Sequence, residues 1–111
     1  DDAAFAEARS RDLLRRGYGA RRVSQALFHA GVDREETPIP ALSQSETRAA
    51  ALSFARRRRL GPFGTRDEDP RTREKQLAAL VRAGHDFDAA RALVDAANEK
   101  EAEEWASSAE D

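Results

Sequence analysis

The sequence predicts an all-α fold, built as an elongated series of tandem three-helix repeats. The composition points to helices, because Ala occurs 23 times and Arg 17 times while β-branched residues are few. Large core residues are also scarce, with seven aromatics and no Met among 111 residues. Any core must therefore consist mainly of Leu, Val and Ala, which favours thin helical packing over a thick β-sandwich.

The composition also excludes several classes of protein. Because the chain has no Cys, it can form no disulfide framework, thiol nucleophile or cysteine metal site. Its apolar runs are far shorter than the ~20 residues that cross a bilayer, and no signal-peptide pattern opens it. We expect a cytoplasmic monomer without membrane contact. Since the chain starts at Asp1-Asp2 rather than at Met, we also expect a segment to precede it.

Glycines mark the ends of the first two helices. A helix is expected over residues 3–16, ended by the Gly17-Tyr18-Gly19 turn as a glycine C-cap. A second is expected over residues 20–30, ended by Gly31, because its apolar residues recur at steps of three and four. The stripe consists of Val23, Ala26, Leu27 and Ala30.

A short third helix is expected after Asp33. This side chain can accept the free amide hydrogen bonds of a first turn, and Glu36 stands at the capping-box position. Pro38 and Pro40 cannot continue a regular helix, so the element must be short.

A fourth helix begins the second half of the chain. Ser43 or Ser45 can cap it, and it is expected to run to about Leu60 and to stop at Gly61-Pro62. Its expected apolar side consists of Ala49, Leu52 and Ala55.

Two more helices follow. A fifth starts at Asp69-Pro70, an N-cap acid followed by a proline at the first helical position, and ends at Gly84. Asp86 caps a sixth, which is expected to fray after Asn98. Their apolar residues are Leu77, Leu80 and Val81 in the fifth, and Phe87, Ala90, Leu93, Val94 and Ala97 in the sixth.

The helix endings indicate an internal duplication. Gly17 aligns with Gly61 at an offset of 44 residues, and Gly31 aligns with Gly84 at an offset of 53. The loop from Gly61 to Asp69 supplies the extra residues. The predicted parts are a three-helix unit at residues 1–42, a second at residues 43–98, and an acidic C-terminal tail at residues 99–111.

Charge is distributed unevenly along the chain. Residues 48–66 carry a net charge of +6 without a single acid, whereas residues 99–111 carry –5. The middle of the chain is therefore suited to an anionic partner. Because the Glu-rich tail offers little apolar surface to bury, we expect it to be partly ordered, and either solvated or competing for the basic patch.

Two groups of arginines are the candidate partner-binding residues. The run Arg56 to Arg59 turns through three 100° steps of a helix, so its members cannot all point one way, and at least one must pack its stem on the apolar side. The other group brackets Tyr18, which either packs at the turn or stacks on a base. Arginine can grip a carboxylate or phosphate with two hydrogen bonds, although a solvated helix end is the alternative for the run. The candidates are Arg15, Arg16, Tyr18, Arg21, Arg22, Arg56, Arg57, Arg58 and Arg59.

The parts of an enzyme are missing from the sequence. The two histidines, His29 and His85, have no Cys to pair with, and there is no Gly-x-Ser-x-Gly motif or glycine-rich phosphate loop. His85, Asp86 and Asp88 match no standard metal spacing, and Asp86 is already used as a helix cap. We therefore expect no catalytic residues, no metal and no cofactor, and we expect His85 to be a surface histidine beside a cap.

Two stretches resemble one known family. Asp1-Asp2 with Phe5-Ala6, followed by Arg15-Arg-Gly-Tyr-Gly-Ala-Arg-Arg-Val-Ser-Gln-Ala-Leu27, resembles the second three-helix repeat of the RecX regulators of the RecA recombinase. Ala55-Arg-Arg-Arg-Arg-Leu-Gly-Pro-Phe63, the Asp69-Pro70 start and Leu80-Val-Arg-Ala-Gly84 with Phe87 are similar to the third repeat. The resemblance covers roughly residues 1–97.

The resemblance implies an enzymatically inactive, all-helical regulator whose first repeat would be missing here. Such proteins lodge in the groove of the RecA filament on single-stranded DNA and restrain its growth and activities. For this chain we expect at most weak contact with single-stranded DNA. Three positions depart from the family pattern, namely Arg9, the prolines Pro38 and Pro40, and His85. The first two affect the packing expected for residues 1–42.

Three functions remain open from the sequence. The chain can be a regulator of the RecA filament, a small helical nucleic-acid binder that uses its basic middle, or a helical adaptor for an unrelated protein. Salt separates them, because a DNA binder that neutralises several phosphates loses affinity steeply as salt rises. The net charge of –2 favours a protein partner over independent DNA binding.

Overall fold

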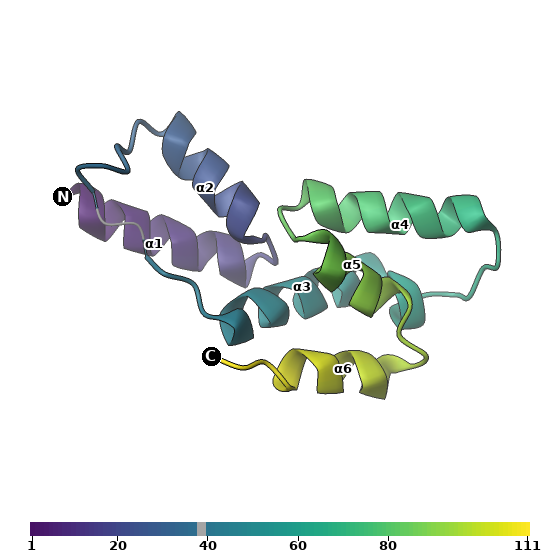
Figure 1. The fold of residues 1–111 in the computed structure, drawn as a ribbon. Coiled ribbons are helices and arrows are strands. Elements are labelled where there is room, and N and C mark those ends of the chain that lie inside the picture. The colour runs from purple at the N-terminus through teal and green to yellow at the C-terminus, as the bar shows by residue number, and fades with distance from the viewer. Residues whose placement is uncertain (38–39) are drawn as a thin grey trace.

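The computed structural model, which describes residues 1–37 and 40–111, is all-helical and elongated, as predicted (Figure 1). Its principal extents are 48 × 27 × 19 Å, and the described residues include no strand. The elements in these two ranges are α1 (Asp2–Arg15), α2 (Ala20–His29), α3 (Gln44–Arg58), the 3-10 helix η1 (Gly61–Phe63), α4 (Pro70–Arg82), α5 (Phe87–Val94) and α6 (Glu99–Ser107).

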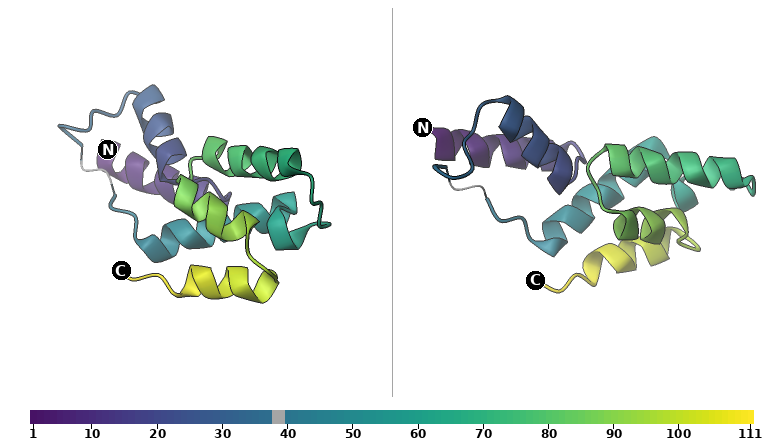
Figure 2. Two further views of the ribbon diagram at one scale, coloured as in Figure 1. Left: turned by 45° about the vertical axis from the view of Figure 1, so that its right-hand side comes forward. Right: turned by 45° about the horizontal axis from the view of Figure 1, so that its top comes forward.

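The helices form two groups (Figure 2), and each group packs around a hydrophobic cluster. The smaller cluster lies between α1 and α2, and the larger one lies among α3, α4, α5 and α6. Tyr18 packs partly buried against both clusters. The buried members of the smaller cluster are Ala6, Leu13, Val23, Leu27 and Val32, and the larger one is built around Phe54, Leu77, Leu80, Leu93 and Val94.

The expected third helix is wrong for the described residues: residues 34–36 form a turn. The Asp33 side chain accepts from the Glu35 amide at 2.8 Å, and its backbone carbonyl accepts from the Thr37 amide at 2.7 Å. A helix cannot grow from this turn, because a residue that precedes a proline is disfavoured in the α region and Thr37 precedes Pro38. Residues 38 and 39 lie outside the described ranges.

A complete capping box starts α3. Ser43 accepts from the Glu46 amide at 3.1 Å, and the Glu46 carboxylate accepts from the Ser43 amide at 3.3 Å. The helix ends at Arg59, which adopts the left-handed conformation with φ of 57°. The expected apolar side was partly wrong, because Ala49 is exposed, whereas Leu52 is half-buried and packs against the larger cluster as expected. The buried residues are Ala50, Ala51, Phe54 and Ala55.

The expectation of a partly ordered tail is wrong for residues 99–107, which form α6 along α3 (Figure 1). Asn98 starts this helix by accepting from the Glu101 amide at 2.8 Å. The small Ala102 is fully buried against the larger cluster. Trp105 packs partly buried against the larger cluster and so adds apolar contact area to this Glu-rich segment. The Arg48 guanidinium lies 4.7 Å from the centroid of the Trp105 ring and donates to the Trp105 carbonyl at 2.7 Å.

Candidate partner-binding surface at the joint

Two loops meet where the first pair of helices joins the rest of the molecule (Figure 1). The Gly19 amide donates to the Ala83 carbonyl at 2.8 Å, and the Arg21 amide donates to the Gly84 carbonyl at 3.1 Å. No side chain caps α2 at Gly19. The carbonyls of Ala83 and Gly84, which directly follow α4, therefore accept hydrogen bonds from amides at the start of α2 that have no partner within that helix. We call this contact between the turn 17–19 and the loop 83–85 the joint.

Glycine is required at two positions of the joint. A Cβ on Gly19 would lie 2.5 Å from the carbonyl carbon and oxygen of Gly84. A Cβ on Gly84 would lie 2.5 Å from the backbone nitrogen of Arg22, and Gly84 also has a φ of +102° that other residues rarely adopt. The two backbones can approach this closely only because neither residue has a side chain.

His85 lies inside the joint, and the expectation of a surface histidine is wrong. Its side chain is 3% exposed, and its Nε2–H donates to the Gly17 carbonyl at 2.8 Å. Burial lowers the pKa of His85 below its ordinary value, although the Gly17 carbonyl and the Asp86 charge oppose that shift. The imidazole is therefore a neutral hydrogen-bond donor that links the two loops. The sequence hid this role, because only the fold brings Gly17 and His85 together.

A basic surface borders the joint. Tyr18 and Phe54 line two adjoining shallow hollows, together with residues of α2, α3 and α4 and with Arg16 directly after α1. Arginines cover both rings, because the Arg22 guanidinium lies 4.8 Å from the Tyr18 centroid and that of Arg58 lies 5.1 Å from the Phe54 centroid. We call these residues the joint surface: Arg16, Tyr18, Arg22, Phe54, Arg57, Arg58 and Arg82.

Most arginines of the joint surface are free of acidic neighbours. Across residues 1–37 and 40–111, only Arg16 of this set forms an ion pair, with Asp12 at 3.3 Å. Arg57 donates instead to the Arg15 carbonyl at 2.9 Å and to the Ser53 hydroxyl at 2.8 Å. The guanidinium groups of Arg22, Arg58 and Arg82 belong to exposed residues. Such groups can form bidentate hydrogen bonds with the carboxylates or phosphates of a partner.

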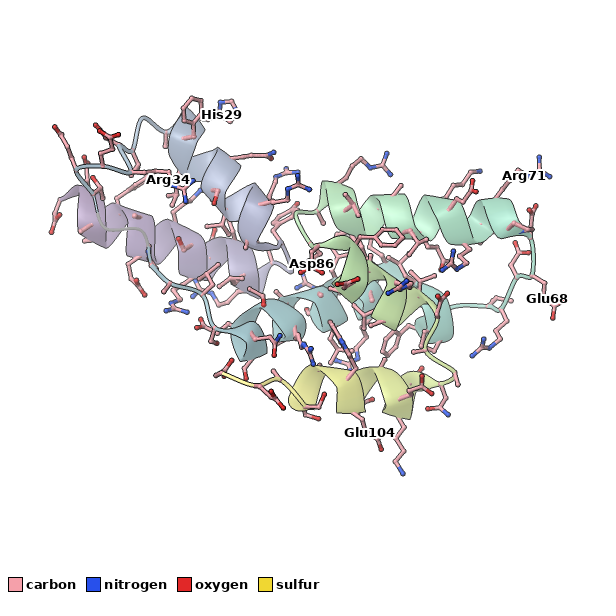
Figure 3. The ribbon with its side chains drawn as sticks, in the orientation of Figure 1. His29, Arg34, Glu68, Arg71, Asp86 and Glu104 are labelled. Carbon is pink, nitrogen blue, oxygen red and sulfur yellow. The ribbon has the colours of Figure 1, made fainter. Side chains whose placement is uncertain are left out.

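The other candidate arginines lie elsewhere. Arg56 pairs with Glu103 at 3.5 Å, and Arg59 forms the left-handed end of α3. Arg15 pairs with Asp12 at 3.7 Å and lines a different hollow between α1 and α3. Arg21 faces the groove at the start of α5, together with the acids Asp86 and Asp88. Figure 3 labels Asp86 at this place, between α2 and α5.

Sequence reasoning missed Arg82, which lies in the last turn of α4 and lines the joint surface. A signal for it was present, because Arg82 stands two residues before Gly84, as Arg15 stands before Gly17 and Arg59 before Gly61. A basic residue in the last helical turn interacts favourably with the helix dipole, so this position reads equally well as plain helix stabilisation.

The described residues contain no group of three His, Cys, Asp or Glu side chains arranged to hold a metal ion. None of their helices is long and apolar enough to span a membrane. The fold and the joint surface define the class as a small, all-helical repeat protein with five arginines on one surface between two helical clusters.

Comparison with known proteins gives the family. The profile of "RecX, second three-helix domain" matches residues 1–36. The chain is 37% identical over 88 residues to "Regulatory protein RecX" of Agrobacterium fabrum, covering 79% of this chain and 47% of that protein. It is 35% identical over 102 residues to "Regulatory protein RecX" of Myxococcus xanthus, covering 86% of this chain and 53% of that protein. No solved structure matches significantly. The chain belongs to the RecX family and spans about half the length of these curated relatives.

Proposed function

We propose that this protein is a non-enzymatic regulator that acts in the cytoplasm, binds the RecA filament on single-stranded DNA and restrains its ATPase and recombinase activities. Its family and its two "Regulatory protein RecX" relatives support this proposal. The single observation that carries the site is the gathering of Arg22, Arg57 and Arg58 on one surface without acidic partners among the described residues.

The proposal includes the predicted division into helical units at residues 1–42 and 43–98, acting as a monomer. The two hydrophobic clusters support the boundary near residue 42, because one cluster lies between α1 and α2 and the other lies after Ser43 and also includes Ala102 of α6. A binding surface that spans two units suits a partner with an extended, repeating shape, such as a protein filament.

Independent DNA binding is the weaker alternative. Single-stranded nucleic acid is commonly held by aromatic rings on which bases stack. Here Arg22 lies over the Tyr18 ring and Arg58 lies over the Phe54 ring, while Phe54 itself is only 6% exposed. The chain as a whole is also net negative, at –2. We therefore expect only weak contact with bare DNA at physiological salt.

The test is RecA-dependent ATP hydrolysis on single-stranded DNA, measured with wild type and two triple variants. One variant replaces Arg22, Arg57 and Arg58 by Ala, and its matched control replaces Arg21, Arg56 and Arg59 by Ala, so that each removes three positive charges. An exposed charge contact is worth ~0–1 kcal/mol, so losing three should weaken inhibition by about tenfold or more. The control should inhibit as wild type does.

Three results would count against the proposal. Wild type without any effect on RecA would refute the assigned partner. Equal loss in both triple variants would mean that total charge matters and the joint surface does not. Tight binding to bare DNA that falls steeply with salt would favour the nucleic-acid binder instead.

A further inference from the structure

The arginines of the joint surface come from both sides of the joint. Arg22 belongs to α2, which packs on the smaller cluster, whereas Arg58 and Arg82 belong to α3 and α4 of the larger one. All three line one hollow above Tyr18 and Phe54. Neither half of the molecule could present this set of guanidinium groups alone.

The joint lies directly beside these arginines along the chain. Arg22 follows Arg21, whose amide donates to the Gly84 carbonyl at 3.1 Å, and Gly84 lies two residues after Arg82. A shift of one loop against the other would therefore change the separation of Arg22 from Arg82. The backbone hydrogen bonds of the joint therefore limit how far the backbone of Arg22 can move relative to that of Arg82.

The joint is better shielded than the polar side-chain links between α1 and α3. The loops meet at glycines that are themselves buried, and His85 bonds to Gly17 from a position only 3% exposed. Two polar links between α1 and α3 are the hydrogen bond from Arg57 to the Arg15 carbonyl and the ion pair of Arg11 with Glu46. Such exposed or half-exposed contacts contribute little to rigidity.

We propose that the joint is the positioning element of the partner-binding surface, and that Arg82 is a further partner-binding residue on it. Gly19, Gly84 and His85 act as positioning residues, because they hold the two halves at the spacing at which Arg22, Arg58 and Arg82 contact one partner together. This inference rests on the function proposed above and assigns the structural basis of its site.

The main test uses two glycines with the same local setting. Gly84 and Gly31 each follow an Ala helix cap and have positive φ, +102° and +82°. A Cβ at Gly31 would meet nothing within 4 Å, whereas a Cβ at Gly84 would collide with Arg22. Both Gly→Ala variants therefore carry similar backbone strain, but only Gly84→Ala disturbs the joint. The readout is equilibrium binding to RecA filaments on single-stranded DNA, with helix content from circular dichroism.

We expect Gly84→Ala to bind the filament about tenfold more weakly than Gly31→Ala, because two linked contacts lose their combined affinity when geometry prevents simultaneous engagement. Gly19→Ala should act in the same direction. Its φ of –93° suits any residue, so its effect comes from the collision of its Cβ with the Gly84 carbonyl and with Nδ1 of His85, which both belong to the joint.

Arg82→Ala tests the added residue without touching the joint. Its matched control is Arg71→Ala, at the opposite end of α4 and labelled in Figure 3 far from the joint. Because Arg82→Ala loses one exposed contact, it should bind the filament about two- to fivefold more weakly than wild type. Arg71→Ala should bind the filament as wild type does. This pair decides the role of Arg82 even if Gly84→Ala loses helix content, in which case Gly19→Ala decides the role of the joint.

The outcomes separate this inference from the proposed function. If wild type binds the filament and both Gly84→Ala and Gly19→Ala bind as well as Gly31→Ala, the joint does not position the surface and the inference is overturned while the function stands. If Arg82→Ala binds as Arg71→Ala does, Arg82 is no partner-binding residue. If wild type fails to bind the filament, the proposed function is wrong and the inference falls with it.

Discussion

The loop after α2 and the loop after α4 have nearly the same sequence but different surroundings. Ala30-Gly31-Val32-Asp33 and Ala83-Gly84-His85-Asp86 differ at a single position. Both place glycine at positive φ after a helix, so the local sequence fixes the turn in each case. Yet Gly31 is exposed with nothing near it, whereas Gly84 is buried against Arg22 and Gly19. The same Ala-Gly-x-Asp sequence only ends a helix at residues 30–33, whereas at residues 83–86 it also joins two halves of the molecule.

The two loops should differ most in how much stability the protein loses when their glycines are replaced. Ala in the left-handed region costs roughly 1–2 kcal/mol, and we expect Gly31→Ala to lower the free energy of unfolding by that amount. Gly84→Ala should lower it by a further ~1–3 kcal/mol, because its Cβ overlaps the backbone of Arg22. Urea unfolding followed by circular dichroism measures both. If both variants lose the same free energy of unfolding, the joint accommodates the Cβ added at position 84 without an energetic cost.

The one differing position gives a second test. His85→Val converts the second loop into the sequence of the first and leaves the Gly17 carbonyl without its buried donor. An unsatisfied buried acceptor costs about 1–3 kcal/mol, so the free energy of unfolding should fall by that amount. The reverse change, Val32→His, puts a polar ring into the smaller cluster and should also destabilise the protein. If His85→Val is neutral, the bond to Gly17 contributes nothing to the joint.

Stability should also depend on pH through His85. Burial lowers its pKa in the folded protein, so below about pH 6.5, the ordinary histidine pKa, the unfolded chain binds a proton that the folded protein does not. The free energy of unfolding should therefore decrease as pH falls from about 7 through 6.5, until the lowered pKa of the folded state is reached. His85→Gln should flatten this dependence, and His29→Gln is the control that removes the other histidine. An unchanged slope in His85→Gln would contradict this account.

The smallest effect is expected one turn before each glycine. Phe28 stands three residues before Gly31 and is 71% exposed, while Val81 stands three residues before Gly84 and packs partly buried against the larger cluster. Phe28→Ala should change the free energy of unfolding by no more than about 0.5 kcal/mol, as surface substitutions usually do. Val81→Ala should lower it by more, in urea unfolding of both variants. A larger loss for Phe28→Ala would mean that its ring is covered in solution.

Local sequence signals predicted most helix boundaries, because glycine, proline and capping acids act within a few residues of where they stand. Asp69-Pro70 starts α4 and Asp86 caps α5, as expected. The error in the tail arose because the outcome there depends on contacts distant in sequence. Nothing near Ala102 shows that α3 will bury it, so residues 99–107 read as a partly ordered tail.

The candidate surface was likewise predictable only in part, because local sequence reveals its arginines but not which of them face the same way. The two arginine groups were visible in the sequence, but which members face together depends on the joint. Arg22 and Arg58 line one hollow, while the neighbouring Arg21 and Arg59 do not. Adjacent helical residues point about 100° apart, and the joint between the start of α2 and the loop 83–85 selects the one that faces the hollow.

Amide hydrogen exchange at Gly19 and Arg21 tests the joint most directly. First-turn amides of a helix have no partner within it and exchange quickly unless something else accepts their hydrogens. Here the acceptors are the carbonyls of Ala83 and Gly84, at 2.8 and 3.1 Å. We predict that both amides are protected in wild type to the level of the buried helical amides, and that Gly84→Ala exposes them while Gly31→Ala does not. Rapid exchange of both amides in wild type would contradict a fixed joint between the two halves.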